Sequence, residues 1–295
     1  MTWEQILPYL LLIIVPIVCD SKTFFQSALN KRTNLDDKGT LLFVAIISFI
    51  SAIVISACFW RTLPDYRTVI FGVIFGILSG IYQFSYMKSL MDGPMSITVI
   101  ICNMCIILPV SYGFIFLNET ITAAKIIGIG LIFLTLIFLN LRKKEEKKPN
   151  KLWIIFVILA FLSAGFSKVI QSYFNTLSCA SQSNEFLAIS FITTGIITLL
   201  GAFIYKPKEK IKYEFNKQTT PLTLAVGVTL AFYNVLVMIS LNRVDGSIFF
   251  PVTAGLGIIL FVLYGLIINK EKLNVYQIVG IASGVVGIVL VNLNI

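Results

Sequence analysis

The chain has 295 residues, of which 57% are hydrophobic and only 13% charged, and its formal net charge is +9. A soluble domain needs about 25% charged residues, so this composition excludes a soluble protein and predicts one embedded in lipid. The sequence has no histidine, which excludes histidine-based chemistry. Because the basic residues cluster between apolar segments, we interpret the positive charge as that of loops at a membrane surface, not of a nucleic-acid-binding face.

Ten segments are apolar and long enough to span a bilayer, a distance that takes about 20 helical residues. All are expected to be helices, because lipid offers no partners for open backbone groups. The expected fold class is therefore an all-α integral membrane protein with ten transmembrane helices. In chain order the segments cover roughly 5–27, 38–60, 68–90, 94–117, 122–141, 152–176, 185–205, 219–241, 247–268 and 274–293.

Polar residues stand near the end of the first segment, where Asp20, Ser21, Lys22 and Gln26 follow a long apolar run. Ionisable groups inside membrane helices are costly and usually face a polar cavity or a partner. Gln26 shares a helix face with Lys22, since residues four apart are neighbours. The alternative is snorkelling, in which the lysine stem lifts its ammonium group to the lipid headgroups.

The five cysteines all lie in apolar context, and Cys102 and Cys105 form a single CxxC pair. The sequence contains no second pair and no histidine with which this pair would build a common zinc site. We therefore interpret the cysteines as small, polarizable packing residues, and we expect neither a metal nor another cofactor.

An internal repeat divides the chain. The stretches SYGFIFLNE and LYGLIINKE align at a spacing of 152 residues, and the Ser-Lys pair at 21–22 aligns with the pair at 167–168. The pairs Tyr82-Gln83 and Tyr233-Asn234 also align, at a spacing of 151. The predicted organisation is a first five-helix repeat at 1–141, a basic linker at 142–151 and a second five-helix repeat at 152–295.

Five helices is an odd number, so the second repeat must enter the membrane from the opposite side. Transporters commonly contain such inverted repeats, related by a two-fold axis in the membrane plane, with the substrate site near the midplane at the repeat interface. Inverted duplication favours transport, because it offers two near-equivalent conformations that open to opposite sides.

Each half also contains a turn glutamate followed by a glycine-bearing helix, in NETITAAKIIGIG and NKEKLNVYQIVGIA. Together with the two five-helix halves, these motifs resemble the EamA-like transporters of the drug/metabolite transporter superfamily over nearly the whole chain. The resemblance implies a ten-helix permease of the cell membrane that moves a small metabolite, often an amino acid or a relative.

The two repeated lysines carry the main functional hypothesis. An inverted axis places Lys22 and Lys168 at equal depths on opposite sides of the midplane, where their ammonium groups would bind an anionic or zwitterionic substrate. Alternatively, Asp20 neutralises Lys22 and leaves only Lys168 free. For the aligned tyrosine–amide pairs, the alternative to substrate binding is helix–helix contact. The expected substrate-binding residues are Lys22, Lys168, Ser21, Gln26, Gln171, Tyr82, Gln83, Tyr233 and Asn234.

Acidic residues near the segment ends are interpreted as structural. Asp92 and Asp245 begin Asp-Gly turns. Glu119 and Glu271 precede helices, where a negative charge stabilises the N-terminus of the helix that follows; a proton-coupling role is their alternative. Glu185, at the start of the seventh segment, fits either role.

Basic residues predict the orientation of a membrane protein. The loops after segments 1, 3, 5, 7 and 9 contain 17 Lys and Arg, and those on the other side contain 4. This bias predicts both termini outside and the 142–151 linker in the cytoplasm, whereas the resemblance implies cytoplasmic termini.

The predicted function is secondary-active or facilitative transport of a small metabolite across the plasma membrane by alternating access. The expected partners are a small-molecule substrate and the lipid bilayer, and a monomer would suffice. Coupling to protons would have to rest on carboxylates alone. The alternatives are a receptor or scaffold, for which the short loops offer little surface, and an integral-membrane enzyme, for which the sequence has no Ser-His or Cys-His pair.

Overall fold

The structure, a computed structural model, describes residues 3–30, 37–93, 95–140, 151–204, 219–268 and 275–292. Within these ranges every regular element is a helix. The helices are α1 (Trp3–Asn30), α2 (Asp37–Phe59), α3 (Tyr66–Asp92), α4 (Met95–Asn103), α5 (Ile107–Phe116), α6 (Ala123–Asn140), α7 (Lys151–Phe174), α8 (Ser183–Ile204), α9 (Thr219–Leu241), α10 (Gly246–Ile268) and α11 (Val275–Asn292), with the 3₁₀ helices η1 (Met104–Ile106) and η2 (Ala180–Gln182).

Seven stretches of the described helices are long and apolar enough to cross a membrane, and each overlaps a predicted segment. Shorter apolar helices at Ala123–Phe138, Gly246–Gly257 and Ile278–Val291 coincide with the other three. Large apolar side chains such as Ile53 and Ile204 are 67% and 81% exposed, as expected for a surface that faces lipid. The multi-pass helical membrane class is confirmed, whereas ten complete crossings remain a prediction.

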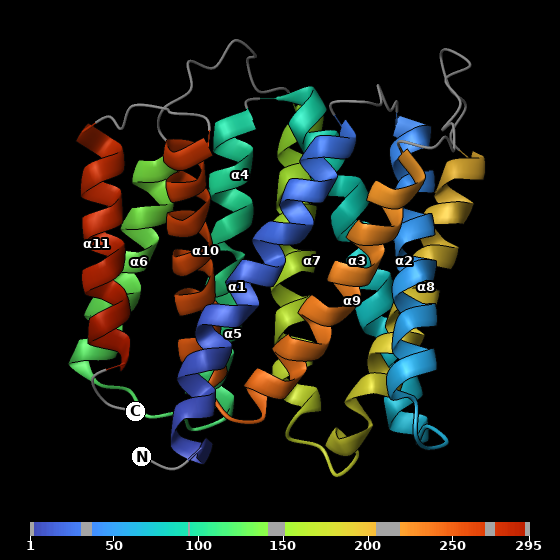
Figure 1. The fold of residues 1–295 in the computed structure, drawn as a ribbon, viewed down its shortest axis with the longest axis horizontal. Coiled ribbons are helices and arrows are strands. Elements are labelled where there is room, and N and C mark those ends of the chain that lie inside the picture. The colour runs from blue at the N-terminus through green and yellow to red at the C-terminus, as the bar shows by residue number, and fades with distance from the viewer. Residues whose placement is uncertain are drawn as a thin grey trace.

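Successive helices run in opposite directions, with α4, η1 and α5 forming one continuous rod (Figure 1). As a result α1 and α7, which open the two halves, are antiparallel. The start of α1 and the end of α11 lie at the same end of the bundle, at the bottom of the view, together with the connections α2–α3, α5–α6, α7–α8 and α9–α10. We call this the terminus-bearing end.

The helix packing is symmetric between the halves. Extensive contacts join α2 to α8 and α6 to α11, and also α3 to α7 and α1 to α9. In chain order, α1 corresponds to α7, α2 to α8, α3 to α9 and α6 to α11. Exchange of corresponding helices leaves the pairs α2–α8 and α6–α11 unchanged and converts α3–α7 into α1–α9. Figure 1 shows α6–α11 and α2–α8 at opposite ends of the long axis, with α1, α3, α7 and α9 between them. This is the packing that an inverted repeat requires.

The fourth predicted segment, 94–117, contains the apolar helical stretch Ile97–Phe116, but this stretch is not one uninterrupted α-helix. α4 ends at Asn103, and a 3₁₀ turn separates it from α5. Pro109 accounts for the break, because proline has no N–H to donate to the carbonyl of Cys105 one turn earlier. That carbonyl lies close to α7, where a Cβ at Gly165 would be 2.9 Å from its oxygen. Mid-helix 3₁₀ segments often mark functional hinges.

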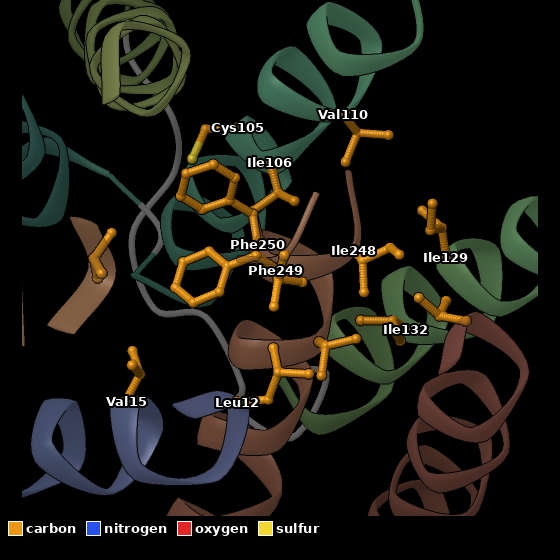
Figure 2. Packing of buried hydrophobic residues seen from close by; sticks show 14 of the residues in the cluster. Leu12, Val15, Cys105, Ile106, Val110, Ile129, Ile132, Ile248, Phe249 and Phe250 are labelled. Atoms are coloured by element: carbon orange, nitrogen blue, oxygen red, sulfur yellow. The ribbon is translucent and has the colours of Figure 1, made fainter. Parts of the chain in front are cut away.

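The largest buried apolar cluster surrounds this break and draws residues from both halves. Figure 2 shows the rings of Phe249 and Phe250 from α10 at its centre, with Cys105 of η1 beside them. The two rings are in an edge-to-face arrangement, with centroids 5.2 Å apart. The break therefore lies at the contact between the halves, where a relative movement of the halves would change the packing around it.

A Gly128→Ala substitution is expected to lower thermal stability. Gly128 of α6 and Gly287 of α11 approach so closely that a Cβ on either would lie 2.7 Å from the other's carbonyl oxygen. The methyl group would push the two backbones apart, and overpacking of this kind costs about 1–3 kcal/mol. A thermal-shift scan of the purified protein should show a lower midpoint.

Gly130, on the same helix, is the matched control. A Cβ there would meet nothing within 4 Å, and alanine is the better helix former. The Gly130→Ala variant should therefore melt at the wild-type temperature or above it. Equal midpoints for the two variants would contradict the close α6–α11 approach.

Candidate functional site

Lys168 of α7 points at the break in the fourth span. Its Nζ donates a hydrogen bond to Sγ of Cys105 at 3.2 Å. Gly165, one turn earlier on α7, makes this approach possible, because any side chain there would meet Leu108 and the Cys105 carbonyl. Lys168 is half-buried. Among the described residues, its hydrogen-bond partner is the Cys105 thiol.

Lys22 of α1 lies near the same place. Cys19, one turn before Lys22, interacts electrostatically with both Lys22 and Lys168. Cys102 of α4 interacts in the same way with Cys105 and Lys168. Lys168, from the second half, thus lies near thiols of α1 and of the fourth span in the first half. We call Cys19, Lys22, Cys102, Cys105 and Lys168 the lysine–thiol cluster.

Two of the predicted tyrosines adjoin this cluster. Tyr82 of α3 packs against the buried clusters that contain Cys102 and Cys105, and Tyr233 of α9 packs against the one that contains Cys105. Tyr82 also stacks on Tyr86, with ring centroids 5.5 Å apart and an interplanar angle of 24°. These aligned tyrosines of the two repeats thus lie beside the thiols of the cluster.

The other five predicted residues are not linked to the cluster by any recorded contact. Ser21 donates to the Ile17 carbonyl of its own helix at 2.8 Å, and Asn234 donates to the Leu230 carbonyl at 3.0 Å. Gln26 and Gln83 are half-buried and Gln171 is buried. Their role in binding stays a prediction.

Asp20 interacts electrostatically with Lys22, as the alternative hypothesis expects, but one of its oxygens is left without a hydrogen bond among the described residues. This oxygen, Oδ2, is buried. The other oxygen, Oδ1, faces α10, where a Cβ at Gly257 would lie 3.8 Å away.

The sequence analysis did not predict that cysteines and Tyr86 would form part of this site. Cys102, Cys105 and Cys19 were interpreted only as packing residues, yet Cys105 accepts the hydrogen bond of Lys168. Pro109 was the available signal, because a proline in an apolar helix frees the carbonyl one turn before it. No group of three or more metal-ligating side chains occurs in the part of the chain that the structure describes.

The terminus-bearing end holds a second polar arrangement, and it corrects the prediction for Glu119. This glutamate does not cap α6, the helix that follows it. Its Oε1 accepts from the Gly246 N–H at 3.1 Å and its Oε2 from the Ser247 N–H at 3.0 Å, so it caps α10 of the other half. Its repeat counterpart, Glu271, lies outside the described residues.

Glu185 makes a matching contact in the other direction. From the start of α8, its Oε1 accepts from the N–H groups of Arg61 and Thr62 at 2.8 and 3.0 Å. Nearby, the Gln182 side chain accepts from the Asp65 N–H at 2.8 Å and donates to the Leu63 carbonyl at 3.1 Å. Each half thus contributes a glutamate that holds backbone of the other half.

An ion pair between a buried lysine and a half-exposed aspartate joins the halves at the same end. Nζ of Lys125, a residue with 1% of its side chain exposed, lies 3.5 Å from Oδ2 of Asp245. The same ammonium group donates to the Thr120 carbonyl at 3.0 Å. We call the contacts of Glu119, Gln182, Glu185 and the Lys125–Asp245 pair the latch.

A cavity of about 460 Å³ between α2 and α8 shares no lining residue with either arrangement. Apart from Ser56 its lining is apolar, and it includes the lipid-facing Ile53 and Ile192. It lacks the charged groups of the lysine–thiol cluster and does not form part of that site.

Apolar helices packed symmetrically in two halves, with lysines held where the halves meet, define a multi-pass membrane protein of the kind that binds small molecules between its repeats. The chain belongs to the EamA-like transporter family, whose model matches residues 7–141 and 151–293. A solved structure described only as "Crystal structure of protein" is similar over 97% of this chain and 96% of its own, with a TM-score of 0.78 and 14% sequence identity. That likeness shows the fold alone. No curated protein matches the chain in sequence.

Proposed function

We propose that the chain carries a small anionic or zwitterionic metabolite, an amino acid or a relative, across the plasma membrane by alternating access. Membership of the EamA-like transporter family supports transport of a small molecule. The observation that carries the substrate class is the contact of Lys168, from the second half, with Cys105 of the first half, whose sulfur lies 3.2 Å from the ammonium nitrogen.

The surroundings of Lys168 favour an anion. An ammonium group in a membrane helix is costly unless it is paired, and the partner here is a thiol sulfur at 3.2 Å. A thiol is a weak acceptor, whereas a carboxylate forms charge-assisted hydrogen bonds that are about twice as strong as neutral ones. A substrate carboxylate would therefore replace the thiol with a net gain.

Alternating access is supported by the way in which the two halves meet. The packing is unchanged when the halves are exchanged, and an inverted repeat of this kind lets one bundle rock against the other around a fixed site. The 3₁₀ break at Met104–Ile106 lies beside Lys168, where a small change in backbone would alter the site.

Counterflow in proteoliposomes tests the proposal. Vesicles that contain the purified protein and a high concentration of unlabelled amino acids should transiently accumulate a radiolabelled amino-acid mixture, and the rate should saturate. A thermal-shift screen against single amino acids and other small organic acids then identifies the substrate. A receptor or scaffold would be stabilised by its ligand without any counterflow, and that result would overturn the proposal.

A further inference from the structure

Asp20 is an acidic residue in the interior of a membrane span. It lies on α1 within the apolar stretch Ile6–Gln26, and one of its carboxylate oxygens is buried without a hydrogen-bond partner among the described residues. The other acids whose side chains the structure describes, Asp65, Asp92, Glu119, Glu185 and Asp245, lie at or beyond helix ends. The latch does not involve Asp20, and neutralisation of Lys22 would leave the buried oxygen of Asp20 without a hydrogen-bond partner.

Few charges face Asp20. Helices α9 and α10, which pack on α1, contain no Lys, Arg, Asp or Glu, and their titratable residues are Tyr233 and Tyr264. Opposite Asp20 on α10 stands Gly257. On α1 itself the neighbours are Cys19 and Lys22, and Lys168 of α7 is within electrostatic range of Cys19.

A buried carboxylate oxygen needs either a cation or a proton. Lys22 is in electrostatic range of Asp20, but the two residues are two positions apart on a helix and do not share a face. The unpartnered Oδ2 is therefore not satisfied by Lys22. It is a place where a proton can bind.

We propose that Asp20 is the proton-binding group through which transport is coupled to a proton gradient. This inference rests on the proposed function. With Asp20 ionised, the formal charge of Asp20, Lys22 and Lys168 together is about +1, and with Asp20 protonated it is about +2, since a lysine at neutral pH carries one positive charge. An anionic substrate binds better to the second form.

Coupling follows from linkage. If protonation of Asp20 raises the affinity for the substrate by some factor, the bound substrate raises the affinity for the proton by the same factor. The proton adds to a carboxylate oxygen from the aqueous phase on one side and leaves to the aqueous phase on the other, together with the substrate. Proton and anion thus move in the same direction.

An infrared titration of the purified full-length protein tests proton binding without any substrate. The carbonyl stretch of a protonated carboxylic acid should grow as the pH falls, and an Asp20→Asn variant should lose one such titrating component. Asp65→Asn, which removes an exposed acid at a helix end, is the control for band assignment. A titrating band that survives in full in Asp20→Asn would overturn the proposal.

A transport measurement then tests the coupling. In proteoliposomes with an inward proton gradient, the wild-type protein should concentrate the radiolabelled amino-acid mixture, and Asp20→Asn should lose this accumulation together with the pH dependence of counterflow. If wild-type counterflow occurs but ignores the gradient, or if Asp20→Asn still accumulates substrate, Asp20 is not the coupling group. Absence of wild-type counterflow would instead count against the proposed function, and the infrared titration would still decide whether Asp20 binds a proton.

Discussion

Replacement of Lys168 with methionine is expected to weaken transport of an anionic or zwitterionic substrate by about 10- to 150-fold. Methionine keeps an unbranched apolar stem and removes the ammonium group that now reaches Cys105. A hydrogen bond to a charged group contributes about 1.5–3 kcal/mol, which corresponds to that range of affinity. The loss should be seen in the initial rate of counterflow as a higher substrate concentration for half saturation.

Lys151→Met is the matched control, because it removes the same charge from the same helix. Lys151 is exposed at the first residue of α7, away from the lysine–thiol cluster. It should transport like the wild type. If Lys168→Met does so too, the ammonium group has a snorkelling role only, and the proposed site is wrong.

The effect of Lys22→Met should depend on Lys168. In the proposed site one substrate contacts both ammonium groups, and neighbouring groups of one site do not contribute additively. The double variant is therefore expected to lose measurable uptake, with a coupling energy that differs from zero in a double-mutant cycle. Strict additivity would show that the two lysines act in separate places.

Much of the fold could be predicted because lipid leaves the backbone few choices. A segment such as 38–60 must be helical to satisfy its own N–H and C=O groups, and the observed α2 (Asp37–Phe59) differs by one residue at each end. The repeat spacing also carried tertiary information. It predicted that the two halves are related by exchange of equivalent helices, and the paired contacts α3–α7 and α1–α9 agree with that.

The direction of individual polar side chains could not be predicted from the sequence. Ser21 and Asn234 bond to carbonyls of their own helices, because a carbonyl one turn earlier is always in reach of such a side chain. The sequence pattern does not distinguish a polar side chain that bonds to its own helix from one that binds a substrate.

Glu119 shows a second limit. Capping rules consider the helix that follows in sequence, whereas the observed partner is the start of α10, 127 residues away. The chain turns at Asn118, whose φ of 52° lies in the left-handed region. The Glu119 N–H bonds to the Gly113 carbonyl at 3.2 Å, and the side chain is thereby aimed at the other half.

Removal of both Glu119 and Glu185 is expected to open the terminus-bearing end. Each carboxylate accepts two backbone N–H groups of the other half. A hydrogen bond to a charged group contributes about 1.5–3 kcal/mol, and about 2.7 kcal/mol changes a two-state equilibrium about 100-fold. The double Ala variant should therefore populate a conformation in which the latch is broken and the lysine–thiol cluster is reached from this end.

Two measurements in nanodiscs, where both membrane faces are accessible, follow this opening. Hydrogen exchange should rise in peptides covering 243–250 and 60–66, which contain the released N–H groups. In a Cys58→Ser background, which removes an exposed thiol, a membrane-impermeant maleimide should label Cys105 about tenfold faster or more, in line with the expected population shift.

Asp65→Ala separates a latch from a simple loss of stability. Asp65 lies at the same end and its Oδ1 accepts from the Arg67 N–H at 2.8 Å, so it caps α3 within its own half. Its removal should loosen the start of α3 and lower the melting temperature without faster labelling of Cys105. If Asp65→Ala exposes Cys105 as much as the Glu119/Glu185 double variant does, the glutamates stabilise the fold in general and do not hold the two halves together at this end.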